Sequence, residues 1–429
     1  MNYFLQIWQT PTLRRRILFT LMILVIFRLA AHIPIPGVNA EGLKGIFEQN
    51  ALLGVFSALT GGSMEKFSLV LMGLSPYINA SIILQLLTVI IPKLEQLSNE
   101  GESGRKKINQ YTRLLTIPLA LVQSYGMVIL LNNSAVAAGQ TLLDVKNWAL
   151  MLPVMITITA GTILAMWLGE IISEKGIGNG TSLLIFSGIV SAIPPIFGRI
   201  LGVSQYDPSK LPSFIGFCIF TLVLLVVITL FTEAIRNIPI TYASRGAQAQ
   251  RSNLPLRLNQ SGMVPIIFAI SVVTFPALLA QFLSTAQSEG LKKFSSLILN
   301  YLNSSNPSYI YIGLYFLLVW GFSYFYVSIV FKPDQMAENI QKRGGFVPGI
   351  RPGVPTANYL DKISTNLTFW GGGFLGLVAV LPLFFQKYTS LQSSDMIISG
   401  SGLIIVVGVV LELIRQINAE LVSHDYDKI

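Results

Sequence analysis

Ten long apolar segments constrain the fold of this 429-residue chain more than any other feature. A helix needs about 20 predominantly apolar residues to cross a bilayer. Only 11% of the residues are charged, whereas about 25% is usual in a soluble domain. We therefore predict an all-α polytopic membrane protein with ten transmembrane helices. The predicted spans are residues 17–33, 67–91, 114–131, 149–168, 181–197, 214–231, 263–282, 310–331, 367–385 and 397–414.

The distribution of Lys and Arg predicts the orientation of these spans, because cytoplasmic loops carry an excess of both residues. An even number of spans places both termini on one side of the membrane. Most of the 29 Lys and Arg residues lie on that side, in the termini and in the loops around 93–113, 236–257 and 332–362. We therefore predict a multi-pass protein of the cytoplasmic membrane with both termini in the cytoplasm.

The ten spans divide into two sets of five, residues 1–200 and 201–429. Because five is odd, the second set begins on the opposite side from the first, as in an inverted repeat. A short motif recurs in the second span of each half, as Gly73-x-x-Pro76 followed by Ile78 and as Gly262-x-x-Pro265 followed by Ile267. Coincidence is the alternative, since the chain has 36 Gly and 21 Pro. We predict two pseudo-symmetric inverted five-helix halves.

One apolar segment, ALLGVFSALT at 51–60, is too short to cross the membrane. It lies on the predicted outer side, directly before the second span, and is followed by Gly61 and Gly62. Two interpretations remain open with equal weight. It is either a short re-entrant helix folded back into a protein-lined cavity or an interfacial helix on the outer surface.

The sequence contains no Walker phosphate loop, no HExxH motif and no Cys/His cluster, and it has two His and one Cys. The glycine-rich run 176–180 lacks the strand–helix context of a dinucleotide site, so we expect a flexible turn that re-enters the membrane. We predict no enzymatic activity and no cofactor. No carboxylate lies clearly at the midpoint of a span, which argues against the main alternative function, a secondary transporter with inverted repeats.

Several side chains suggest a constriction. Leu74 and Ile78 lie four residues apart on one helix face, as do Thr181 and Ile185. Together with Ile267 and Ile405 in two other spans, converging aliphatic side chains would form an apolar barrier to ions and water. The spacing alone favours ordinary packing or contact with lipid.

The loops 236–260 and 332–366 are long, basic and hydrophilic. The second contains a dense Pro/Gly pattern at 344–353, which fixes backbone angles around Arg351. Positive-inside bias explains the charge but not the Pro/Gly pattern. We interpret this loop as a docking surface for a soluble partner.

Six longer stretches carry a family resemblance. They are IPIPG at 33–37, PYINASIILQLL at 76–87, GESGRKKINQYTR at 101–113, WLGEIISEKGIGNGTSLLI at 167–185, LPLRLNQSGMVPIIF at 254–268 and GFVPGIRPGVPTANYLDK at 345–362. With these stretches and its span count, the chain resembles the SecY family, the channel subunits of the bacterial protein-translocation machinery. The resemblance implies a protein-conducting channel that translocates signal-bearing polypeptides and releases transmembrane segments laterally into the membrane.

The resemblance also implies roles for individual segments. Two five-helix halves enclose an hourglass pore, and the second and seventh spans form its lateral gate. The segment 51–66 resembles the plug that closes the outer funnel, with Leu52, Leu53, Val55, Phe56, Leu59, Gly61 and Gly62 as its residues. The pore-ring positions match Leu74, Ile78, Thr181, Ile185, Ile267 and Ile405. Thr181 departs from the family, in which an aliphatic residue is usual; its hydroxyl either weakens the seal or is satisfied by its own helix backbone.

The basic loops, 233–261 and 332–366, resemble the docking surface for the SecA motor or the ribosome. Arg351 matches an important family position, and Lys342 and Arg343 of the same loop are assigned to the same docking surface. We assign Arg245 and Arg251 only loosely, because the loop between residues 242 and 254 is shorter than in many members. The further partners that the family implies are SecE, SecG, signal peptides, unfolded polypeptides and anionic lipid.

Overall fold

The computed structural model describes residues 7–36, 63, 66–137, 142–145, 147–206, 210–242, 250–283, 288–301, 308–388 and 399–426. Each of the ten predicted spans corresponds to a helix within these residues. The ten helices are α2 (Pro11–Ala30), α5 (Ser75–Ile90), α7 (Glu102–Ala137), α8 (Trp148–Lys175), α9 (Gly180–Tyr206), α10 (Lys210–Glu233), α11 (Val264–Leu283), α13 (Tyr309–Val330), α15 (Val354–Tyr388) and α16 (Gly400–Tyr426). The predicted all-α polytopic class is confirmed.

Length and composition alone give a lower number of spans. Among the described residues, six helices pass such a test, or seven if α5 and the following helix α6 (Pro92–Asn99), bent by 102° against it, form one span. The arginines of α2 place it outside the test. The described apolar parts of α9 and α11 are Gly180–Pro194 and Val264–Val273. The two helices themselves continue to Tyr206 and Leu283, so both are long enough to cross a membrane.

The second predicted span is wrong in its first third. Residues 67–74 form a succession of turns, and α5 begins only at Ser75. Phe67 has φ 45° and Gly73 has φ 52°, both in the left-handed region. The irregular stretch packs closely on α8, since a Cβ on Gly161 would lie 1.8 Å from the Leu69 carbonyl oxygen. The segment is apolar because it is buried within the protein, not because it crosses the membrane as a helix.

A small antiparallel sheet, which the sequence analysis did not predict, projects from one end of the helices. Its strands are β1 (Ile235–Tyr242), β2 (Gln250–Arg257) and β3 (Gly345–Phe346), in the order β2-β1-β3. The inward-facing side chains of β1 and β2 pack with α14 (Pro333–Lys342) and α15 in a separate core that includes Ile238, Ile240, Leu256, Ile340 and Leu360. The two predicted basic loops therefore form one folded unit.

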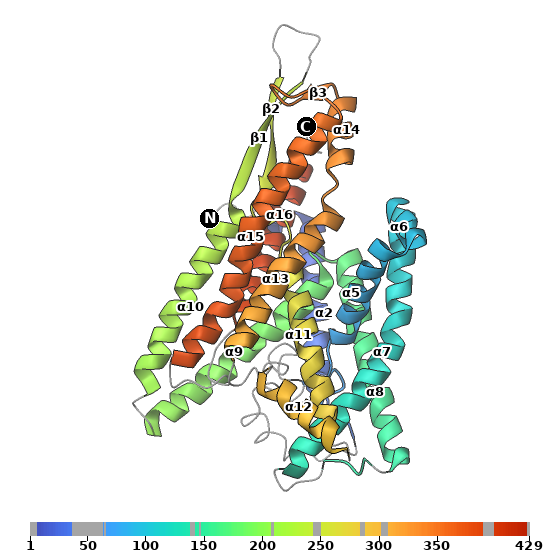
Figure 1. Ribbon diagram of the computed structural model, residues 1–429, viewed down its shortest axis with the longest axis vertical. Coiled ribbons are helices and arrows are strands. Elements are labelled where there is room, and N and C mark those ends of the chain that lie inside the picture. Colours follow the sequence, from blue (N-terminus) through green and yellow to red (C-terminus); the bar gives the residue numbers. More distant parts are fainter. Residues whose placement is uncertain are drawn as a thin grey trace.

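Figure 1 shows the sheet, α6 and α14 at one end of the molecule, and α12 (Glu289–Tyr301) at the other. Arg16 near the start of α2 forms an ion pair with Glu420 near the end of α16, at 2.5 Å. The start of the first span and the end of the last span thus lie side by side. This agrees with an even number of spans, which places both on the same side of the membrane.

The outward faces of the helices are apolar. On α10, Leu222 is 63% exposed and Leu230 is 69% exposed. Exposed aliphatic faces of this kind are stable only against lipid or other apolar surfaces. The chain is a multi-pass membrane protein.

Candidate functional site

The repeated Gly-x-x-Pro motif marks the beginnings of α5 and α11. Gly73 and Gly262 have φ 52° and 62°, a conformation that glycine adopts without a steric penalty. Each glycine is followed two residues later by a helix that carries Pro in its first turn, where a missing N–H has no cost. The same local device therefore starts the second helix of each half.

Five of the six predicted ring residues lie in one apolar cluster. Leu74 is 6% exposed and Ile405 is 1% exposed, and Ile78, Ile185 and Ile267 pack against the same buried group. Leu74 directly precedes α5, and the other four residues lie on α5, α9, α11 and α16, which come from the first and the second half of the chain. The structure therefore brings together side chains that are more than 300 positions apart in sequence.

Thr181, the sixth predicted ring residue, lies at the second position of α9, one turn before Ile185. Its hydroxyl donates to Asn179 Oδ1 at 2.7 Å. The same oxygen accepts from the backbone N–H groups of Thr181 and Ser182, so Asn179 is the N-cap of α9. The Thr181 methyl faces α8, 3.3 Å from the position of a Cβ on Gly169. The hydroxyl is thus satisfied by the cap side chain, not by the helix backbone.

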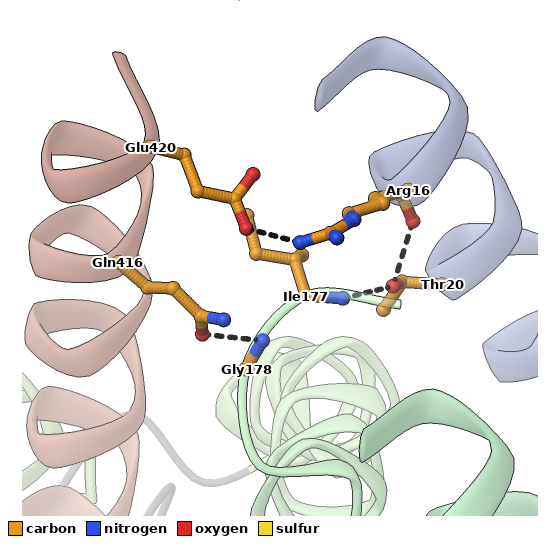
Figure 2. A network of polar contacts seen from close by, with 6 residues as sticks. All are labelled: Arg16, Thr20, Ile177, Gly178, Gln416 and Glu420. Atoms are coloured by element: carbon orange, nitrogen blue, oxygen red, sulfur yellow. Dashed lines mark hydrogen bonds and ion pairs between the residues drawn. The ribbon is translucent and has the colours of Figure 1, made fainter. Parts of the chain in front are cut away.

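The glycine-rich loop 176–180 is packed from three sides, contrary to the flexible turn expected from its sequence. Ile177 N–H donates to Thr20 Oγ1 at 3.0 Å, and Gly178 N–H donates to Gln416 Oε1 at 2.7 Å. The Thr20 hydroxyl in turn donates to the Arg16 carbonyl at 2.9 Å. Figure 2 shows the loop held between α2 and α16 by these contacts. Glycine is needed here for close approach rather than for flexibility.

The seven predicted plug residues, Leu52, Leu53, Val55, Phe56, Leu59, Gly61 and Gly62, lie outside the described residues. The chain on either side of them is described. Ile35 N–H donates to the Phe67 carbonyl at 2.9 Å, and Leu69 N–H donates to the Ile33 carbonyl at 2.9 Å. The described residues on the two sides of this stretch therefore lie next to each other, and Ile35 and Phe67 are buried in the same apolar cluster.

Arg351 lies on an exposed and well-defined loop. Ile350 N–H bonds to the Val347 carbonyl at 3.0 Å across Pro348 and Gly349, and Gly349 has φ 82°. Pro followed by a residue with positive φ is typical of a type II turn. The Arg351 carbonyl accepts from Thr356 Oγ1 at 2.9 Å, while its side chain is exposed. The backbone around this guanidinium is fixed, which is favourable for a docking contact.

The other predicted docking residues differ in their surroundings. Lys342 forms an exposed pair with Glu338 at 2.7 Å, a geometry that contributes little to stability. Arg343 is exposed at the end of α14. Arg251 lies on β2 opposite Thr241 of β1, and Arg245 lies outside the described residues.

Several basic residues near the same end are engaged within the chain instead. Arg415 bonds Glu233 Oε1 at 2.6 Å and the Thr232 carbonyl at 3.3 Å, which ties α16 to the end of α10. Burial, followed by the nearby Arg415 guanidinium, lowers the pKa of Arg257 on β2. Net positive charge at this end therefore includes side chains that stabilise the fold as well as side chains available to a partner.

Sequence reasoning missed three residues of this site: Asn179, Thr20 and Gln416. Asn before a glycine and a helical segment is a capping signal, so Asn179 could have been found. Thr20 and Gln416 carry no sequence signal, because their partners are backbone N–H groups far away in the chain. Among the described residues, no group of three His, Cys, Asp or Glu side chains could hold a metal ion.

The geometry and the family comparison point the same way. The SecY family model matches residues 68–414. The chain belongs to the SecY family. Protein translocase subunit SecY of Halalkalibacterium halodurans is 37% identical over 432 residues, covering 98% of this chain and 97% of that protein. The SecY subunit of Rickettsia typhi is 39% identical, covering 96% of this chain and 94% of the other.

Solved structures of channels share the SecY fold seen here. A protein-conducting channel matches with a TM-score of 0.69 at 19% identity, covering 96% of this chain and 94% of that one. Sec61 from a canine ribosome–channel complex matches with a TM-score of 0.65, also at 19% identity. At this identity the likeness concerns the fold alone.

Proposed function

We propose that this SecY-family chain is the channel-forming subunit of a protein translocase. It moves signal-bearing polypeptides across the cytoplasmic membrane and releases transmembrane segments laterally into the bilayer. The observation that carries this proposal is the apolar cluster in which α5, α9, α11 and α16 converge, within a chain that matches translocase subunits over nearly its whole length.

The resting channel is sealed at this cluster. Leu74, Ile78, Ile185, Ile267 and Ile405 offer no oxygen or nitrogen ligands to replace the hydration shell of an ion. Thr181 contributes little polarity, since its hydroxyl is already bonded to Asn179. The segment 51–66 closes the outer side as a plug, anchored by the backbone bonds between 33–35 and 67–69.

The gate lies between α5 and α11, which contact each other across the two halves. A hydrophobic signal segment gains about 25 cal/mol for each Å² of apolar surface that it removes from water. Insertion between α5 and α11 removes the apolar surface of the segment from water. Because only the open channel accepts the segment there, binding shifts the population of channels towards the open state. Contacts between apolar side chains suit this role because lipid or a signal segment can replace them.

The energy for transport comes from a partner, because the chain carries no nucleotide-binding motif. The exposed basic residues Arg351, Lys342 and Arg343 provide the docking surface for SecA or a ribosome, and they make docking sensitive to salt. SecE and SecG cover part of the apolar outer surface, and anionic lipid covers the basic rim. Both termini face the cytoplasm, together with the sheet and α14.

Protease protection of a preprotein tests this function. Proteoliposomes containing this chain, a SecE-type subunit, SecA and ATP should protect a full-length signal-bearing preprotein from added protease. Protection should be lost without ATP and for a preprotein that lacks its signal sequence. Absence of protection, with saturable uptake of a small solute by the same vesicles, would replace this function with that of a secondary transporter.

A further inference from the structure

The loop 176–180 joins the two halves of the chain at the end that carries the sheet. It follows α8 and precedes α9, both in the first half, and it bonds α16 in the second half through Gly178 N–H and Gln416 Oε1. Within the first half it bonds α2 through Ile177 N–H and Thr20 Oγ1. The ion pair between Arg16 and Glu420 lies beside these bonds, in more exposed surroundings (Figure 2).

The three glycines of this loop have no room for a side chain. A Cβ on Gly176 would lie 2.4 Å from Thr20 Oγ1, and one on Gly178 would lie 2.7 Å from Leu413 Cδ2. A Cβ on Gly180 would lie 1.8 Å from the Gly169 carbonyl oxygen. Gly178 also has φ 81°, which disfavours any other residue. The loop is therefore in direct contact with α2, α8 and α16.

Apolar side chains surround these polar contacts. Ile177 is 4% exposed and packs in a cluster of residues from α2, the loop and α16 and from the chain before α2, namely Ile7, Leu13, Ile17, Leu413, Ile417 and Leu421. A backbone N–H in such surroundings needs a hydrogen-bond partner. Moving α16 away from the loop would leave the Gly178 N–H without its partner and would expose this apolar cluster.

The loop is also connected to the constriction. Gly180 N–H bonds Ser173 Oγ at 2.9 Å, and Asn179 caps the first turn of α9. Ile185, one turn further, belongs to the apolar cluster that seals the channel. The place at which α9 starts, and hence the position of Ile185, is therefore set by contacts that include α16.

We propose that the loop 176–180, with Thr20 and Gln416, is a fixed joint between the two halves that stays closed while the channel opens. This inference rests on the channel function proposed above. Thr20 and Gln416 are positioning residues, which act on the seal through the start of α9. The joint is held by the buried bond of Ile177 N–H and the partly buried bond of Gly178 N–H, and the more exposed Arg16–Glu420 pair is dispensable.

Crosslinking tests whether the joint stays closed. Cysteines would replace Arg16 and Glu420 in a Cys218→Ala background and be joined by a bismaleimide spacer long enough for two extended side chains. Before crosslinking, preprotein protection should equal that of the Cys218→Ala parent, and after crosslinking it should fall by less than half. If protection is lost only after crosslinking, the two halves separate at this place and the proposal is overturned. The proposal is also overturned if the double-cysteine variant gives no protection before crosslinking. An inactive parent would instead contradict the channel function.

Substitution of Gln416 tests the positioning role. Gln416→Leu keeps the approximate shape but removes the acceptor for Gly178 N–H, and it should raise the resting ion conductance of the vesicles severalfold. Gln416→Glu keeps an oxygen acceptor and should conduct as the parent does. Equal conductance of both variants and the parent would overturn the positioning role, and a purely structural role would lower thermal stability in Gln416→Leu without a change in conductance.

Discussion

Two glycine-rich segments at the same end of the molecule, 176–180 and 344–353, have similar compositions and opposite environments. In the first, the backbone N–H groups of Ile177 and Gly178 bond side chains of other helices, and added Cβ atoms would clash. In the second, Cβ atoms on Gly344 and Gly349 would meet nothing within 4 Å, and both glycines have positive φ. Glycine serves close packing in the first segment and mainly turn geometry in the second, where Gly345 is the exception, since a Cβ on it would lie 2.7 Å from Tyr242 Cε1.

This difference fits the two proposed roles, a structural joint for the first segment and a docking loop for the second. The first segment has its polar groups satisfied inside the protein, so it is a poor surface for a partner. The second directs Arg351 into solvent from a turn anchored by buried Val347 and Thr356. A high density of glycine therefore indicates neither flexibility nor binding until the surroundings of each residue are known.

The largest expected effect separates the two segments by stability. Gly180→Ala forces a methyl group against the Gly169 carbonyl and should lower the free energy of unfolding by about 3 kcal/mol. Gly344→Ala, the matched control in the second segment, should cost about 1 kcal/mol, owing to positive φ alone. Thermal unfolding of the purified proteins in detergent measures both. Equal losses would remove the distinction between the segments.

The next expected effect separates them by function. Arg351→Glu should weaken motor docking by about 2 kcal/mol, more than tenfold in affinity, and should reduce ATP-dependent preprotein protection without lowering the unfolding temperature. Lys292→Glu on α12 makes the same charge change at the other end of the molecule and should leave protection intact. Normal protection by the Arg351 variant would argue against the docking role of the second segment.

A smaller effect is expected at the constriction, at Ile267 of α11. This helix belongs to the second half of the chain, which the loop 176–180 contacts through α16. Ile267→Asn places an amide in the apolar cluster and should raise resting conductance in planar bilayers severalfold. Ile267→Leu conserves volume and should cost less than about 1.5 kcal/mol while keeping the channel closed. If the Asn variant conducts no more than the Leu variant, Ile267 does not belong to the seal.

The smallest effect is expected where the joint meets the constriction. Thr181→Ile removes a hydroxyl that bonds Asn179, whose oxygen keeps two backbone donors. Stability should change by about 1 kcal/mol or less, and any residual ion leak should decrease slightly. Thr181→Val, which is nearly isosteric, controls for the added volume. A clear increase in leak in both variants would show that the bond to Asn179 maintains the seal.

The sequence was sufficient for the positions of the spans, because apolar length decides which segments cross a membrane. It failed at residues 67–74, since buried irregular backbone is as apolar as a helix. It missed β1 and β2. Apolar side chains recur there at every second position, at Ile238 and Ile240 and at Leu254 and Leu256, but Pro239 and Pro255 stand between them, and proline argues against a strand. It also misjudged 176–180, because Gln416, which bonds Gly178, is distant in sequence.

The passage of a polypeptide through the apolar cluster is the central claim, and site-specific photocrosslinking tests it most directly. A benzophenone amino acid would replace Ile78 or Ile267, or Leu222 on the outer face of α10 as the control, in channels holding a stalled preprotein. We predict adducts with the preprotein at 78 and 267 and none at 222. Adducts at 222 as abundant as those at 78 and 267, or none at 78 and 267 in channels that protect the preprotein, would contradict a path through this constriction.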